Sequence, residues 1–155
     1  MDTFPHKVFG TRQPGTYYDR PGAYLIPYQD GLFGLVKTPK GLFLIGGGYE
    51  GEESDEDCIR REALEETGRR VENLARFCSA EAFVMHERAG LFHPMQTYYL
   101  GALCDQVTEP AEADHELLFL PYNLIRGQMF SDMQNWAVDQ AYAHENKSAD
   151  PEKAG

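Results

Sequence analysis

The chain has 155 residues, enough for one domain with a full hydrophobic core and too few for two domains of ordinary size. A formal net charge of −11 argues against duplex nucleic acid and anionic membranes as main partners, because both need a basic protein surface. No apolar run approaches the roughly 20 residues that cross a bilayer, and MDTFPHKVFG has no basic start followed by an apolar stretch, so a cytoplasmic location is expected.

The first third of the chain predicts a lead-in followed by short strands. Residues 1–21 are interrupted by proline and glycine and predict an irregular segment with room for one short edge strand. Three β-type runs follow, at 22–28, 32–38 and 41–46. Asp30-Gly31 and Lys40-Gly41 separate these runs as turn signals, and the second is typical of a hairpin.

Residues 54–68 predict a helix with both ends marked. Ser54 is a good N-cap, and Asp57, at the third helical position, completes a capping-box-like arrangement. Gly68 is typical of the residue that ends a helix.

The second half predicts more strands and a final helix. Residues 71–85 and 95–104 have β character, 115–121 predicts a short strand, and 131–145 predicts a helix. The polar segment 148–155 contains Pro151 and is expected to be disordered, which leaves a single domain at 1–147. This order of elements predicts a mixed α/β or α+β fold with helices packed on a sheet.

Three carboxylates of the predicted helix share one edge of its apolar stripe. Because an α-helix advances about 100° per residue, Glu62, Glu65 and Glu66 fall within an arc of roughly 100°. Ile59 lies inside or beside this arc, so the arc is not an obviously solvent-facing surface. Crowded carboxylates repel one another, and a hard divalent cation such as Mg²⁺, which prefers oxygen ligands, would relieve that repulsion. The alternative interpretation is a solvated acidic helix face.

Neighbouring residues fit a bound phosphate compound. Glu53, just before the helix, can fold back to supply another oxygen, and Arg61 can orient a carboxylate or contact phosphate. The glycines at 46–48 let the backbone approach a ligand closely. They lack the Gly-Lys-Ser/Thr ending of a Walker-type phosphate loop.

The segment that begins at Gly47 resembles the Nudix box, written G-x5-E-x7-R-E-U-x-E-E-x-G-U, in which U is a bulky aliphatic residue. It matches all seven fixed identities, which are Gly47, Glu53, Arg61, Glu62, Glu65, Glu66 and Gly68. Ala63 stands at the first U position, and Arg69 departs from the pattern at the last, where Val71 can take over the packing. The order of the other elements resembles compact bacterial MutT-like Nudix domains.

The resemblance implies a Nudix-type α/β/α sandwich, with a mixed sheet between helices. It implies Mg²⁺, or Mn²⁺, held by Glu53, Glu62, Glu65 and Glu66. It also implies that Glu62 and Glu65 direct an attacking water and that Arg61 assists them. Some relatives take a further acid from a later loop, which here would be Glu116 or else Glu112. The substrate would lie against Gly46, Gly47 and Gly48.

The implied reaction is metal-assisted hydrolysis of a diphosphate linkage in a nucleoside diphosphate derivative. A nucleoside triphosphate, cleaved to the monophosphate and pyrophosphate, is the default substrate because the chain is short. No second motif separates this substrate from ADP-ribose, dinucleoside polyphosphates, NADH or coenzyme A. A homodimer is compatible with the family that the chain resembles.

The sequence alone leaves two other functions open. One is a Nudix-fold sensor that binds a nucleotide without turnover, and the other is an interaction domain with an acidic helix. The four box acids favour catalysis, since a sensor has no chemical need for all of them. Arg20, Lys37 and Arg88 could contact phosphate, but no spacing singles one out. His86, His93 and His115 do not form a metal-ligand spacing and are expected to be surface or hydrogen-bonded histidines.

Overall fold

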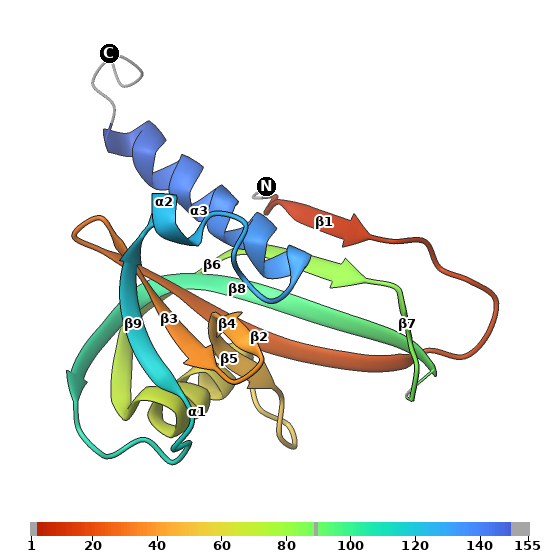
Figure 1. The fold of residues 1–155 in the computed structure, drawn as a ribbon, viewed down its shortest axis with the longest axis horizontal. Coiled ribbons are helices and arrows are strands. Elements are labelled where there is room, and N and C mark those ends of the chain that lie inside the picture. Colours follow the sequence, from red (N-terminus) through yellow and green to blue (C-terminus); the bar gives the residue numbers. More distant parts are fainter. Residues whose placement is uncertain (1–2, 89, 150–155) are drawn as a thin grey trace.

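The computed structural model describes residues 3–88 and 90–149 and consists of nine strands and three helices in these ranges (Figure 1). The strands are β1 (His6–Phe9), β2 (Tyr18–Gln29), β3 (Leu32–Thr38), β4 (Gly41–Phe43), β5 (Ile45–Gly48), β6 (Arg69–Ala82), β7 (Val84–His86), β8 (Gly90–Gln106) and β9 (Glu116–Pro121). The helices are α1 (Asp55–Thr67), α2 (Tyr122–Ile125) and α3 (Asp132–Ala149).

The strands form one mixed sheet whose main order is β1-β6-β8-β2-β3-β4. The β1–β6 and β2–β8 pairs are parallel, and the other strand pairs are antiparallel. β5 adds to β2, β7 adds to β8, and β9 adds to β3. β2 lies at the centre of this sheet because it pairs with three other strands. Its first part pairs with β8 and β5, and its last two residues pair with β3.

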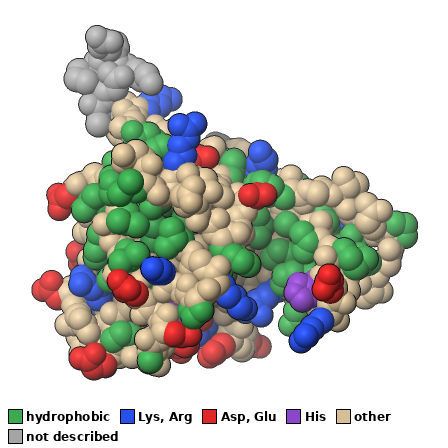
Figure 2. Space-filling view, in the orientation of Figure 1, with side chains coloured by type: hydrophobic (Ala, Val, Ile, Leu, Met, Phe, Trp, Pro, Cys, Tyr) green, Lys and Arg blue, Asp and Glu red, His purple; other side chains and the backbone are tan. Residues whose placement is uncertain are grey.

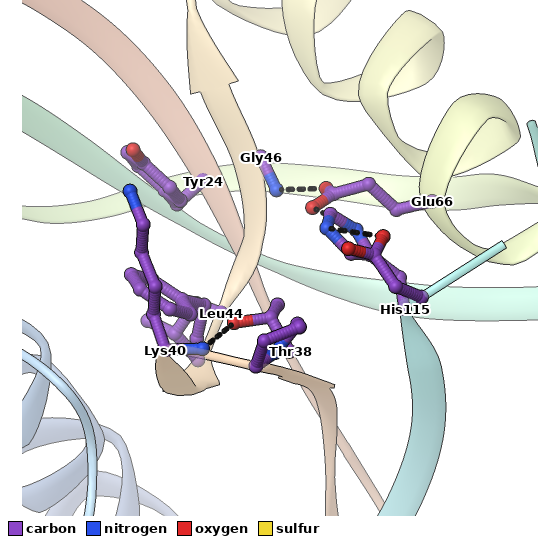
Figure 3. Close-up of a pocket in the computed structure, with 10 residues that line it drawn as sticks. Tyr24, Thr38, Lys40, Leu44, Gly46, Glu66 and His115 are labelled. Carbon is purple, nitrogen blue, oxygen red and sulfur yellow. Dashed lines mark hydrogen bonds and ion pairs between the residues drawn. The ribbon is translucent and has the colours of Figure 1, made fainter. Parts of the chain in front are cut away.

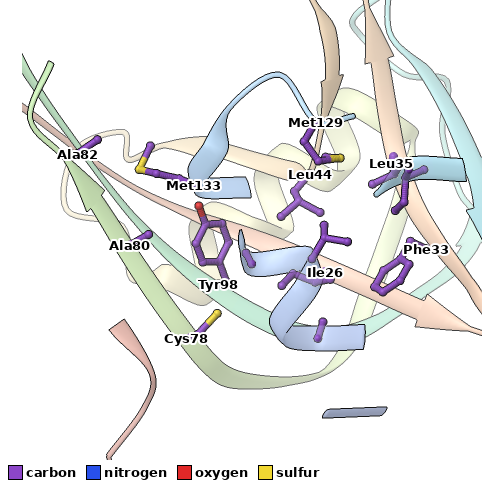
Figure 4. Close-up of a cluster of buried hydrophobic side chains, with 14 residues drawn as sticks. Ile26, Phe33, Leu35, Leu44, Cys78, Ala80, Ala82, Tyr98, Met129 and Met133 are labelled. Atoms are coloured by element: carbon purple, nitrogen blue, oxygen red, sulfur yellow. The ribbon is translucent and has the colours of Figure 1, made fainter. Parts of the chain in front are cut away.

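Successive side chains of β2 point to opposite faces of the sheet, as a strand requires. Ala23 and Leu25 belong to one buried cluster, whereas Ile26 belongs to another, against which Tyr24 also packs. The first cluster contains Cys58, Ile59 and Ala63 of α1, and the second contains Ala137, Val138 and Ala141 of α3. Figure 4 shows this second cluster, in which Tyr98 and Leu44 of the sheet side lie in one buried group with Met133 of α3.

One helix therefore covers each face of the sheet, with α1 below the strands and α3 above them in Figure 1. This confirms the predicted α/β/α sandwich with a mixed sheet. Among the described residues, no helix combines the length and the apolar character that a membrane crossing would need.

Most predicted elements are present, with differences in their bounds. The strand predicted at 71–85 is divided into β6 and β7, and β8 begins at Gly90, five residues before the predicted start at 95. β2 begins at Tyr18, four residues before the predicted start, although Pro21 lies within it. The run predicted as one strand at 41–46 is divided into β4 and β5, which pair with different neighbours. The expected tail at 148–155 overlaps the last two residues of α3, and residues 150–155 lie outside the described ranges.

Candidate active site

The orientation of α1 is fixed at both of its ends. The Ser54 hydroxyl accepts a hydrogen bond from the Asp57 N–H at 3.1 Å, and Gly68 ends the helix in the left-handed conformation, with φ of 71°. Cys58, Ile59 and Ala63 are fully buried against the sheet between these caps. Because these three residues face inward, the glutamates next to them are held at the edge of the helix beside β5.

Arg61 connects most of the acids of the box. Its Nε and Nη2 donate to the two Glu53 carboxylate oxygens at 2.6 and 3.0 Å. Its Nη1 donates to Glu62 at 2.8 Å and to Glu65 at 3.3 Å, and its Nη2 also donates to the Gly48 carbonyl at 3.1 Å. These contacts hold the pKa of the Glu53 carboxyl below its usual range and raise that of the guanidinium. Arg61 therefore positions three of the predicted metal ligands.

Glu66 is the most deeply buried carboxylate of the box, with 7% of its surface exposed. Its Oε1 accepts a hydrogen bond from the Gly46 N–H at 2.9 Å, which ties the end of α1 to β5. Burial is the main cause that raises the pKa of Glu66, to about 8, and the nearby acids Glu62 and Glu112 add to it. Burial likewise raises the pKa of Glu62.

The close approach of Glu62 to β5 depends on a glycine. A Cβ added to Gly47 would lie 2.8 Å from the Glu62 Oε1, nearer than real Cβ contacts come. Gly46, Gly47 and Gly48 all line the same pocket as Glu62 and Glu66. The structure thus brings the predicted substrate-binding glycines together with Glu62 and Glu66, two of the four predicted metal-binding acids.

The segment between β8 and β9 completes one side of the site. Its Ala111 and Glu112 N–H groups donate to the Glu65 carbonyl at 2.8 and 3.3 Å, so the segment is docked on the last turn of α1. Glu112, Asp114 and His115 each offer one ligand atom within 4.8 Å of the others. The buried His115 Nδ1 has no hydrogen-bond partner among the described residues and lies 3.7 Å from the Glu66 Oε2.

Glu116 and Glu112, the two candidates for a later acid, lie in different settings. Glu116 is exposed at the start of β9, opposite Lys37 of β3. Glu112 lies in the docked segment, near enough to Glu66 to raise its pKa. The location of Glu112 beside Glu66 therefore favours Glu112, and not Glu116, as the later acid of the candidate active site.

Two pockets meet at this site. The first, of about 500 Å³, runs from Arg20 across the glycines of β5 to Glu62 and Glu66. The second, of about 350 Å³, lies between Glu66 and Lys40. Figure 3 shows Glu66 and His115 on one side of this second pocket and Tyr24 and Lys40 on the other. Tyr24 lines both pockets, and burial raises its pKa to about 12.

The donor set fits a hard divalent cation. Glu62, Glu65 and Glu66 stand on one helix edge and offer carboxylate oxygens. The group of three ligand atoms that lie within 4.8 Å of one another among the described residues is that of Glu112, Asp114 and His115 in the docked segment. A cation would stabilise the ionised form of Glu66, which burial disfavours, and oxygen-rich sites of this kind suit Mg²⁺ or Mn²⁺. Figure 2 shows acidic side chains along the lower edge of the molecule, where α1 and the segment before β9 lie.

Some residues of the site carry no signal in the sequence. His115 and Asp114 are ordinary residues of a polar loop, and only the docking of that loop on α1 brings them near Glu66. Tyr24 of β2 and Lys40, in the turn between β3 and β4, line one pocket with Glu66, although they lie far apart in the sequence. Arg20 was one of three possible phosphate ligands in the sequence, and the structure places it beside Gly48.

Comparison with known proteins agrees with this architecture. The family model of the NUDIX domain matches residues 20–140. A NUDIX hydrolase from Nitrosomonas europaea shares 17% identity with a TM-score of 0.68, over 82% of this chain and 90% of that one. A MutT NUDIX hydrolase from Burkholderia pseudomallei shares 22% identity with a TM-score of 0.65, over 79% of this chain and 98% of that one.

A third solved structure, an ADP compounds hydrolase, shares 16% identity with a TM-score of 0.60, over 84% of this chain and 74% of that one. At these identities the solved structures establish similarity of fold. No curated protein matches the chain.

The chain belongs to the Nudix family, because the family model covers most of its length. Its enzyme class is accordingly that of the Nudix hydrolases, which act on pyrophosphate bonds. Both the predicted family and the predicted class of enzyme are confirmed.

Proposed function

We propose that the chain is a Mg²⁺-dependent pyrophosphohydrolase that cleaves a diphosphate linkage in a nucleoside diphosphate derivative. The observation that carries this proposal is the arrangement around Arg61, which holds Glu53, Glu62 and Glu65 at the edge of the pocket into which Glu66 is buried. A nucleoside triphosphate, cleaved to the monophosphate and pyrophosphate, is the default substrate.

Each residue has a part in the proposed reaction. Glu53, Glu62, Glu65 and Glu66 would hold Mg²⁺, with Mn²⁺ as a substitute, and the ion would supply charge neutralisation and acidify water. Glu65, with 39% of its side chain exposed, is the box acid most open to an entering water, and Glu62 is the alternative. Arg61 keeps both carboxylates in place, and the β5 glycines leave room for the phosphates.

A nucleoside is supported by the third pocket of the cleft. It has a volume of about 390 Å³ and shares Tyr24 with the two pockets at the acids. Phe43, Phe92 and Phe130 line it, so it offers apolar walls to a flat base. Gln96 lies at the same pocket, beside the buried Gln134, whose amide oxygen accepts a hydrogen bond from the Leu44 N–H.

The proposed partner is a small nucleotide. The protein has a formal net charge of −11, so its surface is a poor match for a duplex nucleic acid or an anionic membrane. A cytoplasmic location and a homodimer belong to the same proposal, and sedimentation of the purified protein tests the dimer.

The test is hydrolysis of a substrate panel by the purified protein with Mg²⁺. The panel contains ordinary and 8-oxo nucleoside triphosphates, ADP-ribose, diadenosine polyphosphates, NADH and coenzyme A. Glu65→Gln and Glu66→Gln are compared with Glu56→Gln, an exposed acid of the same helix that pairs with Arg60. Release of nucleoside monophosphate or phosphate is measured with and without a chelator.

Turnover of one compound that is lost with chelator and in both site variants, but kept in Glu56→Gln, would establish the activity and the substrate class. Nucleotide binding without any metal-dependent turnover would reject the hydrolase and favour a sensor.

A further inference from the structure

The proposed substrate is highly charged, and the cleft that would bind it contains few positively charged side chains. A diphosphate linkage carries several negative charges, and the site already holds Glu62, Glu65 and Glu66. A metal ion offsets part of this charge, and nearby arginine or lysine side chains supply the rest. The cations that line the cleft therefore determine where the phosphate chain lies.

Arg61 has no donor left for a phosphate. A guanidinium has five N–H groups, one on Nε and two on each Nη. The Nε and one Nη2 group donate to Glu53, the other Nη2 group to the Gly48 carbonyl, and the two Nη1 groups to Glu62 and Glu65. A phosphate oxygen would have to displace one of these bonds.

Arg20 lies on the other side of the glycines. It stands two residues before Gly22, which pairs with Gly48, so the register of β2 and β5 carries its side chain to the end of β5. A Cβ on Gly48 would meet the Nη2, Cζ and Nε of Arg20 at 3.3, 3.5 and 3.5 Å. Three guanidinium atoms at nearly equal distance mean that the group lies against the bare backbone of Gly48.

The guanidinium of Arg20 is available to a ligand. It lines the pocket of about 500 Å³ together with Glu62 and Glu66, and no ion pair joins it to another described residue. Its charge acts on Tyr24, whose pKa it lowers against the larger effect of burial. Arg20 is therefore a free cation that faces the same cavity as the acids.

We propose that Arg20 binds the non-bridging oxygens of the substrate's phosphate chain and holds that chain against Glu62 and Glu66, whereas Arg61 acts only on the carboxylates. This inference rests on the proposed function, because it assigns a substrate contact to the same cleft. It applies to any substrate with two or more linked phosphates.

The test uses a ligand that requires no turnover. Binding of imidodiphosphate to the protein with Mg²⁺ is measured by titration calorimetry for wild type, Arg20→Gln and Arg20→Lys. Arg70→Gln is the control, because Arg70 is an arginine of β6 that lines a separate pocket, and its loss changes the net charge equally. We expect Arg20→Gln to weaken binding by at least about tenfold, as the loss of charge-assisted hydrogen bonds predicts.

Arg20→Lys should recover part of that affinity, because lysine restores the charge without the planar fork. Arg70→Gln should bind within about twofold of wild type, since its charge is remote and screened by salt. With an identified substrate, Arg20→Gln should raise KM more than it lowers kcat.

Equal affinity of wild type and Arg20→Gln, or no binding by wild type, would overturn the inference. Arg20-dependent binding in a protein that hydrolyses no member of the substrate panel would support the inference while rejecting the hydrolase. The two proposals are thus separable by the same set of proteins.

Discussion

Glu66 combines burial, ionisable chemistry and a backbone hydrogen bond at one position. The Gly46 N–H favours its ionised form, whereas burial and the neighbouring acids oppose it, and burial has the larger effect. The metal-free protein therefore keeps Glu66 protonated up to a pH near 8. A divalent cation at the site would reverse this balance, since it favours the ionised carboxylate.

This balance predicts a pH dependence of stability. The pKa of Glu66 is about 8 in the fold, against 4.5 for an ordinary glutamate, so between these values the native state holds more protons than the unfolded state. The free energy of unfolding of the metal-free protein should fall as pH rises from about 5 to about 8, by an amount on the order of 3 kcal/mol from this group. Urea unfolding with chelator measures it.

Glu66→Gln should remove most of that slope, because glutamine keeps the acceptor for Gly46 and does not ionise. Parallel pH profiles of wild type and Glu66→Gln would contradict the assignment.

A second prediction concerns the contacts of Arg61 with the carboxylates. Arg61→Lys retains the charge but cannot reach Glu53 with two donors and the other acids as well, so the carboxylates lose their fixed positions. Activity or metal affinity should fall by about 10- to 100-fold, as for other groups that orient metal ligands. Steady-state kinetics against Mg²⁺ concentration measure both quantities.

The control is Arg60→Lys, the adjacent exposed residue that pairs with Glu56. An equal loss in both variants would show that the effect is not specific to the Arg61 contacts.

Individual residues of the site differ in how far the sequence reveals them. Three of the four box acids share one helix, so the period of the helix alone places Glu62, Glu65 and Glu66 together. Arg20 and His115 come from distant segments whose meeting depends on strand register and loop docking, which have no local pattern. Their roles follow only from the fold.

Among the elements, α1 links the chemistry to the loop that follows β8. Gly68 ends the helix, and its carbonyl accepts hydrogen bonds from the Val107 and Thr108 N–H groups at 2.8 and 3.2 Å. A Cβ on Gly68 would lie 2.0 Å from the Thr108 carbonyl oxygen. The end of α1 and the docked loop therefore form one unit.

Gly68→Ala should disrupt that unit. The left-handed φ of 71° costs about 1 kcal/mol for alanine, and the steric conflict with Thr108 adds about 1–3 kcal/mol. Gly51→Ala is the matched control, since Gly51 has φ of 60° but no atom within 4 Å of an added Cβ, so it should cost only the first amount. Chemical denaturation measures both, and equal losses would contradict the steric argument.

The strands show where local pattern fails at this scale. Prolines and glycines led to the prediction of a mostly irregular segment at 1–21, yet β2 includes Pro21. The Pro21 carbonyl accepts a hydrogen bond from the Tyr49 N–H beyond the end of β5, so the N–H that proline lacks would point to that side and not toward β8. The 41–46 run is continuously apolar in character, and nothing in it marks the change of partner at Leu44. The Asp30-Gly31 turn was predictable, because both residues adopt the positive φ that tight hairpins need.

At the scale of the whole molecule, the acids and the lower core share one helix. Cations that bind Glu62 and Glu66 must therefore stabilise the packing of α1 on the sheet as well. The midpoint of thermal unfolding should rise with Mg²⁺ or Mn²⁺, by the equivalent of about 2.7 kcal/mol at a concentration 100 times the dissociation constant.

A Glu62→Gln, Glu66→Gln double variant should lose that rise, whereas Glu56→Gln should keep it. Differential scanning calorimetry with each ion distinguishes these outcomes, and a rise that persists in the double variant would place the cation elsewhere.

The alternation of β2 has an evolutionary consequence. Ala23 and Leu25 face α1, whereas Tyr24 and Ile26 face α3. The deletion of one residue in this part of β2 would reverse which side chains face each helix. Tyr24, which lines the cleft, would then point into the core on the α1 side. The number of residues in β2 is therefore expected to stay constant among homologous chains.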